Sequence, residues 1–295
     1  MTIRLKELHP FVSLLYYVCA GVCMMMFTHP LYLSVSILIL VGVNILQGTR
    51  EKLIRSMPEI ARMGLIIIVM NPLFVRRGAT VLFYFRHNPV TLEGVAYGMI
   101  MAMSLWGIFI LFISFNDVIH GRKFLFLFSK VWPQLALLLM ITVRFVPLLI
   151  TRWKELYHTQ KLRGHDMFKG SVKKRSRTGM LYMQKLLTWS LEEALQTAES
   201  MNARGFGERK RSHYQLFPFR YSDWGASIVL AGIAGVCVYS AQHGIGTLNV
   251  YPQLETLSFS PSDWLILILF ICLMAFPILL EGGSQLRWHV LNSTN

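Results

Sequence analysis

The feature that most constrains this chain is a stretch of 42 residues, 8–49, that contains no Asp, Glu, Lys or Arg. A helix crosses the hydrocarbon core of a bilayer with about 20 apolar residues, so this stretch is long enough for two crossings. His29-Pro30 lies near its middle. Proline ends a helix and biases the preceding residue away from helical geometry. The sequence therefore predicts a hairpin of two membrane-spanning helices.

Four further stretches are apolar enough to cross a membrane. Residues 94–116, 224–254 and 264–280 carry no charged side chain, and residues 131–150 carry only Arg144. Only 15% of the chain is charged and its mean hydropathy is +0.48, whereas an ordinary soluble protein carries about 25% charged residues. We therefore expect an all-α fold, that of a polytopic helical membrane protein.

The segment 63–85 does not fit a simple crossing. Its first apolar part, 63–75, has 13 residues, which is too few to span a bilayer. Together with residues 81–85 it predicts a re-entrant element, because irregular backbone at membrane depth is tolerated where protein buries it. Basic residues in the connecting loops 50–62 and 76–86 favour a cytoplasmic position for both. The number of crossings between residues 50 and 89 stays open.

The distribution of charge predicts the orientation of the chain. The protein has 29 basic and 15 acidic residues, a net charge of +14, and residues 151–223 alone hold 15 basic and 7 acidic residues, or +8. Because Lys and Arg gather on the cytoplasmic side, we expect this segment and both termini to be cytoplasmic. The predicted domains are a transmembrane region of about four spans (1–150), a cytoplasmic helical domain (151–223), and a C-terminal transmembrane hairpin with a cytoplasmic tail (224–295).

Two helices in the cytoplasmic segment are predicted to end in the same dipeptide, Arg-Gly. The first ends at Arg163-Gly164, and the second runs from about residue 179 to Arg204-Gly205. Glycine adopts the left-handed conformation after a helix end without strain. One interpretation is that each arginine only complements the helix dipole, which stabilises the helix by about 0.3–1 kcal/mol. The other is that its guanidinium forms a bidentate pair with an acidic group of a partner.

The second helix also carries an apolar stripe with three- and four-residue spacing. Such a stripe is buried either against the first helix or against a partner. Its predicted members are Met183, Leu187, Ala194, Ala198 and Met201.

The sequence around these arginines resembles a known family. The run 191–207, with Ala203-Arg-Gly at its core, and the pair Arg144-Phe-Val-Pro and Gln160-Lys-Leu-Arg-Gly resemble the two signatures of the transmembrane T component of energy-coupling factor (ECF) transporters. This group includes the Q subunit of cobalt uptake systems. Asn71-Pro-Leu-Phe with Gly78, and Thr91-Leu-Glu-Gly, are also similar to family patterns.

The resemblance implies a scaffold in an ATP-driven importer for a vitamin or a transition-metal ion in the bacterial plasma membrane. Two ATP-binding cassette ATPases and a membrane-embedded substrate-binding S component would be its partners. Arg163 and Arg204 would couple to the ATPases, with Gly164 and Gly205 at the turns and Ala203 allowing close approach. The apolar stripe would contact the S component, and residues 170–178 would connect the two coupling helices.

Other classes of protein find less support in the residues. The chain has no GxxxxGK[ST] phosphate loop, no HExxH and no CxxC pair, so we expect no catalytic residue, cofactor, resident metal or nucleic-acid partner. A secondary transporter would carry ionisable residues near the middle of broken spans, whereas only Arg144 lies within a span here, close to its cytoplasmic end. That class, or another polytopic membrane protein with a basic interaction domain, remains the alternative. The run 173–177 would also suit an anionic lipid surface.

Overall fold

The computed structural model describes residues 9–75, 80–85, 88–164, 171–208, 219–248 and 260–292. These residues are helical except for one short two-stranded hairpin and the connecting turns. The all-α fold of a polytopic membrane protein is thus confirmed, with the hairpin as an unpredicted addition.

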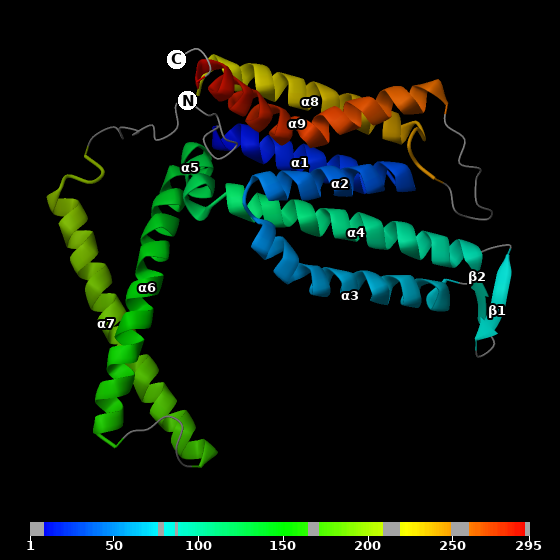
Figure 1. Ribbon diagram of the computed structural model, residues 1–295. Helices are drawn as coiled ribbons and strands as arrows, with labels where there is room; N and C mark the ends of the chain where they lie inside the picture. Colours follow the sequence, from blue (N-terminus) through cyan, green and yellow to red (C-terminus); the bar gives the residue numbers. More distant parts are fainter. Residues whose placement is uncertain are drawn as a thin grey trace. The chain divides into compact units, whose positions relative to one another are not determined.

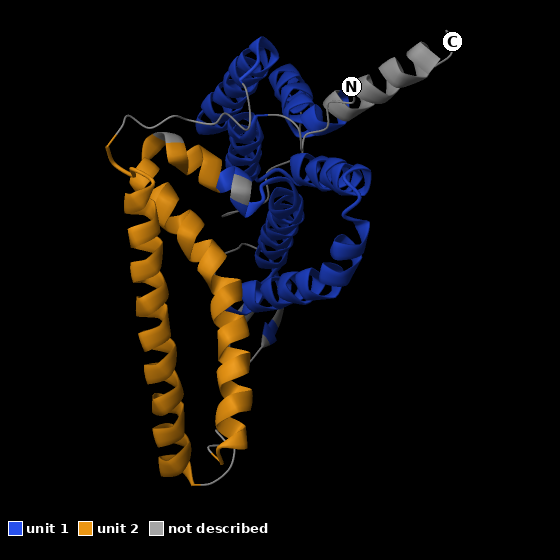
Figure 2. Cartoon of the chain, turned by 90° about the vertical axis from the view of Figure 1, so that its left-hand side faces the viewer, with its two compact units in different colours: residues 1–124, 217–295 blue, residues 125–216 orange. Residues whose placement is uncertain are grey.

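The chain divides into two compact units. Unit 1 comprises residues 1–124 and 217–295, and unit 2 comprises residues 125–216 (Figure 2). The three predicted regions, 1–150, 151–223 and 224–295, are defined by their position relative to the membrane. The division into compact units does not depend on that position, so the three regions stay predictions.

Unit 1 is a bundle in which the two ends of the chain pack together (Figure 1). Its helices are α1 (Pro10–Met26), α2 (Pro30–Leu46), α3 (Arg50–Phe74), α4 (Leu92–Val118), α8 (Tyr221–Gln242) and α9 (Pro261–Asn292), and α5 (Gly121–Val131) begins in it. Helix α1 contacts α4, α8 and α9, and α2 contacts α3, α4 and α9. Helices from residues 10–118 and from residues 221–292 therefore share one bundle.

Aromatic side chains fill the centre of this bundle. Tyr16, Tyr32 and Phe270 are fully buried. The Tyr16 hydroxyl donates a hydrogen bond to the Met274 carbonyl (3.1 Å), and the Tyr32 hydroxyl donates one to the Asp263 carbonyl (2.7 Å). A buried phenol requires such a partner, because an unpaired hydroxyl in an apolar interior costs about 1–3 kcal/mol. These two bonds tie the first helices to α9.

The predicted N-terminal hairpin is confirmed, and both of its helices begin in the same way. Helix α1 ends at Met26 and α2 begins at Pro30. His9 and His29 are the residues before the two helices, and each ring Nδ1 accepts a hydrogen bond of 3.2 Å from the amide two residues later. Proline suits the first helical position because it has no N–H, which would be unpaired there, and because its ring fixes φ near the helical value. The His-Pro pair therefore caps each helix.

The predicted apolar stretches coincide with helices. Four helical segments are long and apolar enough to span a membrane: α4, the N-terminal part of α6 (Pro133–Leu162), α8, and residues Pro261–Leu279 of α9. Helices α1 and α2 are apolar but only 17 residues long each. The four longer segments are thus suited to four of the predicted crossings, and the crossings by α1 and α2 stay predictions.

The structure of residues 50–91 differs from the prediction. Residues 50–62, expected to be a loop, form the first half of the 25-residue helix α3, which continues through the apolar part to Phe74. Residues 81–85, expected within a re-entrant element, form strand β1 (Val81–Phe85), which pairs antiparallel with β2 (Asn88–Thr91). The charged residues of 50–62 are typical of a loop, but they fit the exposed face of a helix equally well.

The family-like motifs at 71–74 and 91–94 meet where α3 ends and α4 begins. The Asn71 side-chain amide donates a hydrogen bond to the Gly94 carbonyl (3.0 Å). The buried Glu93 carboxylate accepts bonds from the Thr80 amide (3.1 Å) and hydroxyl (2.8 Å). Thr91 caps α4 through its hydroxyl, which accepts from the Gly94 amide (3.2 Å). These contacts fix the β-hairpin to the helix pair.

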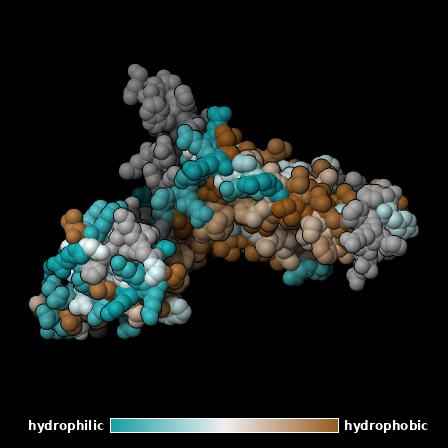
Figure 3. Space-filling view, turned by 90° about the horizontal axis from the view of Figure 1, so that it is seen from below, coloured by the Kyte–Doolittle hydropathy of each residue, from teal (hydrophilic) through white to brown (hydrophobic). Residues whose placement is uncertain are grey.

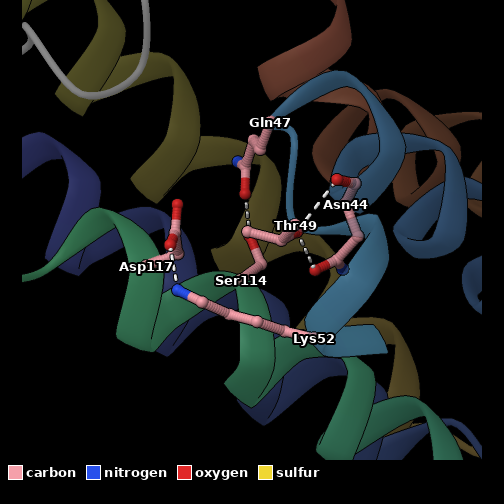
Figure 4. A network of polar contacts seen from close by, with 6 residues as sticks. All are labelled: Asn44, Gln47, Thr49, Lys52, Ser114 and Asp117. Atoms are coloured by element: carbon pink, nitrogen blue, oxygen red, sulfur yellow. Dashed lines mark hydrogen bonds and ion pairs between the residues drawn. The ribbon is translucent and has the colours of Figure 1, made fainter. Parts of the chain in front are cut away.

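Polar side chains join the opposite end of α4 to the turn between α2 and α3 (Figure 4). They are Asn44, Gln47, Thr49, Lys52, Ser114 and Asp117. The Ser114 hydroxyl donates to Gln47 Oε1 (2.6 Å), and the Lys52 ammonium pairs with the Asp117 carboxylate at 2.6 Å. This network holds the end of α4 in place shortly before Gly121 begins α5.

Unit 2 contains most of α5, all of α6 and helix α7 (Val172–Ala203). Helices α6 and α7 cross each other, as Figure 1 shows. The fully buried Tyr182 of α7 lies at the crossing, with its ring 5.8 Å from that of Trp153 and 6.5 Å from that of Tyr157. The guanidinium of Arg152 lies 5.1 Å from the centre of the Trp189 ring. Aromatic packing therefore fixes the crossing point.

Candidate functional site

The two predicted Arg-Gly helix ends have nearly the same backbone geometry. Arg163 follows α6 with φ −81° and ψ 6°, and Arg204 follows α7 with φ −85° and ψ 5°. The glycine after each is left-handed, with φ +82° at Gly164 and +74° at Gly205. Side chains other than glycine pay about 1–2 kcal/mol in this conformation. The prediction that both helices end at these dipeptides is confirmed.

Hydrogen bonds show how the chain turns at these ends. The Gly164 amide donates to the Lys161 carbonyl (3.1 Å), and the Gly205 amide donates to the Asn202 carbonyl (2.9 Å). At the second end the Phe206 amide also bonds the Met201 carbonyl (3.1 Å), which completes a Schellman motif. Backbone amides thus bond three carbonyls at each helix end, residues 159–161 of α6 and 200–202 of α7, without the arginine side chains.

Both arginine side chains are exposed, and Ala203 is exposed beside Arg204. Within the described part of the chain, no ion pair engages Arg163 or Arg204. Arg152 differs, because it pairs with Glu155 (2.7 Å) and stacks on Trp189 within its own unit. The two signature arginines therefore keep their full donor capacity for another molecule.

Arg163 follows the C-terminal end of α6 and Arg204 that of α7, and these two ends lie on opposite sides of the helix crossing (Figure 1). Arg163 lies six residues, or about 9 Å, beyond Tyr157 on α6, and Arg204 lies 22 residues, or about 33 Å, beyond Tyr182 on α7, at a rise of about 1.5 Å per residue. Their separation is roughly 40 Å. One small binding surface therefore cannot contact both arginines.

The apolar stripe of α7 faces away from α6. Met183 and Leu187 are 53% and 59% exposed, whereas Tyr182 and Thr178, on the opposite face, are buried. Burial of this stripe against the first helix, which the sequence left open, is therefore excluded. The complete stripe, here called the α7 stripe, comprises Met180, Met183, Leu187, Leu191, Ala194, Leu195, Ala198 and Met201.

Three members of the α7 stripe were missed in the sequence analysis. Met180, Leu191 and Leu195 are 76%, 67% and 65% exposed. At 100° per residue, they fall within the same 120° sector of the helix as the five predicted members. Extending the three- and four-residue spacing in both directions would have found them.

Comparison with known proteins identifies the family. Residues 4–214 match the sequence profile of CbiQ, described as a cobalt transport protein, over more than half of the chain. The chain belongs to the CbiQ family. This membership confirms the resemblance to the T component of ECF transporters, which the Arg-Gly signatures carried.

Relatives of this CbiQ-family chain share the name energy-coupling factor transporter transmembrane protein. The protein of Leuconostoc gelidum subsp. gasicomitatum is 33% identical over 100 residues, which is 34% of this chain and 37% of the relative. That of Lacticaseibacillus paracasei is 31% identical over 104 residues, 34% of this chain and 39% of the relative. That of Listeria innocua is 27% identical over 183 residues, 58% of this chain and 69% of the relative. The first two alignments thus span less than two fifths of those relatives.

The start of α7 in this CbiQ-family chain differs from the prediction. The helix begins at Val172 rather than near residue 179, so most of the predicted connector 170–178 is helical. Lys173, Lys174 and Arg175 lie in its first turn. Basic residues are unfavourable beside the positive end of a helix dipole, so helix stability alone does not favour this start.

Histidine and acidic side chains do not form a metal site in the described part of this CbiQ-family chain. No group of three or more His, Cys, Asp or Glu side chains there is arranged to hold a metal ion. His120 and His158 are among the described residues, whereas His165 and Asp166 lie outside them. All four cysteines are free.

Proposed function

We propose that this chain is the transmembrane scaffold of an ATP-driven ECF-type importer for a vitamin or a transition-metal ion. The observation that carries the proposal is the pair of equivalent helix ends, each presenting an exposed arginine without a partner in the described residues. The chain itself is non-catalytic. ATP hydrolysis belongs to two ATP-binding cassette subunits, since the sequence has no phosphate-binding loop of its own.

Each arginine docks on one ATPase. A guanidinium presents five donors in a rigid fork, and a bidentate bond to a carboxylate is about twice as strong as a neutral hydrogen bond. Left-handed Gly164 and Gly205 turn the chain away directly behind the arginines, and exposed Ala203 leaves room for the partner to approach. The separation of roughly 40 Å along the crossed helices suits two ATPase subunits rather than one.

The α7 stripe is the contact surface for a membrane-embedded S component. Five of its members are large apolar residues with 53% to 76% of their surface exposed. A contiguous exposed apolar face of this size marks a protein or membrane interface. The helix is mounted on α6 through Tyr182 on the opposite face, so motion of the arginine-bearing ends would reach the stripe directly.

The proposal also includes the orientation predicted from charge. Fourteen of the 15 basic residues of the segment 151–223 belong to unit 2, which supports a cytoplasmic position for the coupling helix ends. In this orientation both chain termini also lie on the cytoplasmic side, where ATP is available. The membrane is the bacterial plasma membrane, and no nucleic acid takes part.

Affinity purification of the tagged chain from its native membranes tests this function. We expect it to bring down two phosphate-loop ATPases and one small apolar membrane protein, whose identity then names the substrate. A chain that purifies without an ATPase, and that alone accumulates a solute in liposomes under an ion gradient, would instead be a secondary transporter.

A further inference from the structure

The two docking ends carry opposite charge. The first, here called the Arg163 end, consists of residues 158–163 and 171–177, which lie on the same side of the helix crossing. It contains six basic and no acidic residues: Lys161, Arg163, Lys173, Lys174, Arg175 and Arg177. The second, here called the Arg204 end, consists of residues 192–208. It contains Arg204 and four acidic residues: Glu192, Glu193, Glu199 and Glu208.

The net charges of the two ends are therefore +6 and −3. Neighbouring residues in the sequence do not remove the difference. Asp166 and Lys169 cancel each other beside the Arg163 end, while the basic run 209–211 brings the Arg204 end only to neutrality. Polar residues dominate the part of unit 2 that faces the viewer in Figure 3, which is seen from the side of the α6 C-terminus.

This distribution opposes the intrinsic preference of α7. A helix is stabilised by acidic residues near its N-terminus and by basic residues near its C-terminus. The first turn of α7 contains no acidic residue and three basic ones, and its last turn contains no basic residue. Helix stability does not account for this order. All four basic side chains of 173–177 are exposed, and so are Glu192, Glu199 and Glu208, so the charges are available to partners.

We infer that the two ends dock on different ATPase surfaces, so that the ATPase pair binds in one orientation. The Arg163 end takes a strongly acidic surface. The Arg204 end takes a surface that offers acidic groups to Arg204 and cationic groups to Glu199 and Glu208. A charged surface attracts a partner surface of opposite charge and repels one of the same charge. This effect determines the orientation of binding more than its affinity. This inference rests on the proposed function.

An anionic membrane surface is the competing ligand for the Arg163 end, and the structure favours a protein. Arg163 and Arg204 occupy equivalent helix ends, and the Arg204 end has a net charge of −3. An anionic membrane surface would repel that end. A protein is therefore the class of ligand that suits both ends.

Photocrosslinking at each end tests the inference. Leu162 (89% exposed) and Phe206 (45% exposed) adjoin the two arginines and can each be replaced by benzoylphenylalanine in the full chain, co-expressed with the ATPases that purify with it. We expect the two positions to capture different ATPase surfaces. Raising NaCl from about 50 to about 500 mM should reduce the Leu162 adduct about fivefold and the Phe206 adduct less than about twofold.

A charge reversal provides the second arm. The triple variant Lys173→Glu, Lys174→Glu, Arg175→Glu should reduce the Leu162 adduct about tenfold and leave the Phe206 adduct unchanged. The matched control, Lys173→Arg, Lys174→Arg, Arg175→Lys, keeps the charge and should behave as wild type.

Each other outcome overturns the inference in a distinguishable way. If both positions capture the same ATPase surface with equal salt dependence, the proposed function stands, but the inference that the ATPase pair binds in one orientation is wrong. Adducts of Leu162 with phosphatidylglycerol in place of ATPase would assign the Arg163 end to the membrane. Absence of any ATPase adduct at both positions would remove the proposed function as well.

Discussion

At the residue scale, Arg163 and Arg204 are important because their side chains are exposed. Backbone amides bond the carbonyls at both helix ends, so the guanidinium groups are not used there. Gly64 matters for the opposite reason. The Trp106 ring occupies the space that a side chain on residue 64 would need, and its Nε1 donates to the Ile60 carbonyl (3.0 Å).

Substitution of Gly64 tests that close approach. Gly64→Ala should destabilise unit 1 by about 1–3 kcal/mol, because the added methyl displaces a ring that is hydrogen-bonded to α3. Gly107→Ala should cost less, since the methyl meets only the flexible end of Met24. Gly232→Ala, with no heavy atom within 4 Å, is the matched control and should be neutral or stabilising. Thermal unfolding in detergent measures all three, and equal melting temperatures for Gly64→Ala and Gly232→Ala would refute the packing.

His29 predicts a dependence of stability on pH. It lies in the turn between α1 and α2 and is buried, which lowers its pKa below 6.5, although the nearby Asp263 carboxylate raises it in part. The unfolded chain therefore binds the proton more readily. Stability from neutral His29 is full above about pH 6.5 and is lost as the pH falls through the folded-state pKa. Protonated Nδ1 also cannot accept from the Leu31 amide.

The control for this effect is His29→Asn, which keeps a capping side chain and does not titrate. Melting temperatures measured from about pH 8 to about pH 5 should fall more steeply for wild type than for this variant. Parallel curves would show that His29 contributes nothing to the pH dependence.

At the scale of elements, the sequence predicted most helices and both Arg-Gly ends, because apolar periodicity and glycine placement are local signals. It failed at residues 50–62 and 81–85. The charged first half of α3 is helical because its buried Leu53 and Ile60 face the bundle, and this contact depends on distant residues. The outward direction of the α7 stripe was equally hidden, since an apolar stripe does not reveal which neighbour covers it.

Substitution of Tyr182 tests the packing of α7 against α6. Tyr182→Ala removes a fully buried aromatic ring from the crossing and should destabilise unit 2 by about 3–5 kcal/mol. Met183→Ala, the adjacent but exposed residue, should leave stability within about 0.5 kcal/mol and weaken only the capture of the S component. Protease sensitivity of residues 171–208 and co-purification of the S component separate the two effects. Loss of stability in Met183→Ala would place the stripe inside the chain instead.

At the scale of the whole molecule, the chain combines two compact units with different exposed surfaces. Unit 1 buries the aromatic centre of the bundle and exposes apolar residues of the kind that face lipid, as on α3 and α8. Apolar residues also predominate on the face of unit 1 seen in Figure 3. Unit 2 has little buried core beyond the helix crossing and exposes two arginine ends and an apolar stripe. We expect a unit that buries so little within its own chain to gain stability from contacts with other subunits and with lipid.

The most direct test of the central claim is the number of ATPase protomers retained per chain, measured by native mass spectrometry of the solubilised complex. We predict two for wild type and for Arg55→Ala, an exposed arginine of α3 that serves as control. Arg163→Ala or Arg204→Ala alone should weaken retention about tenfold, since each removes one charge-assisted contact. The double variant should retain none while its melting temperature is unchanged. Two ATPase protomers on the double variant would contradict the account.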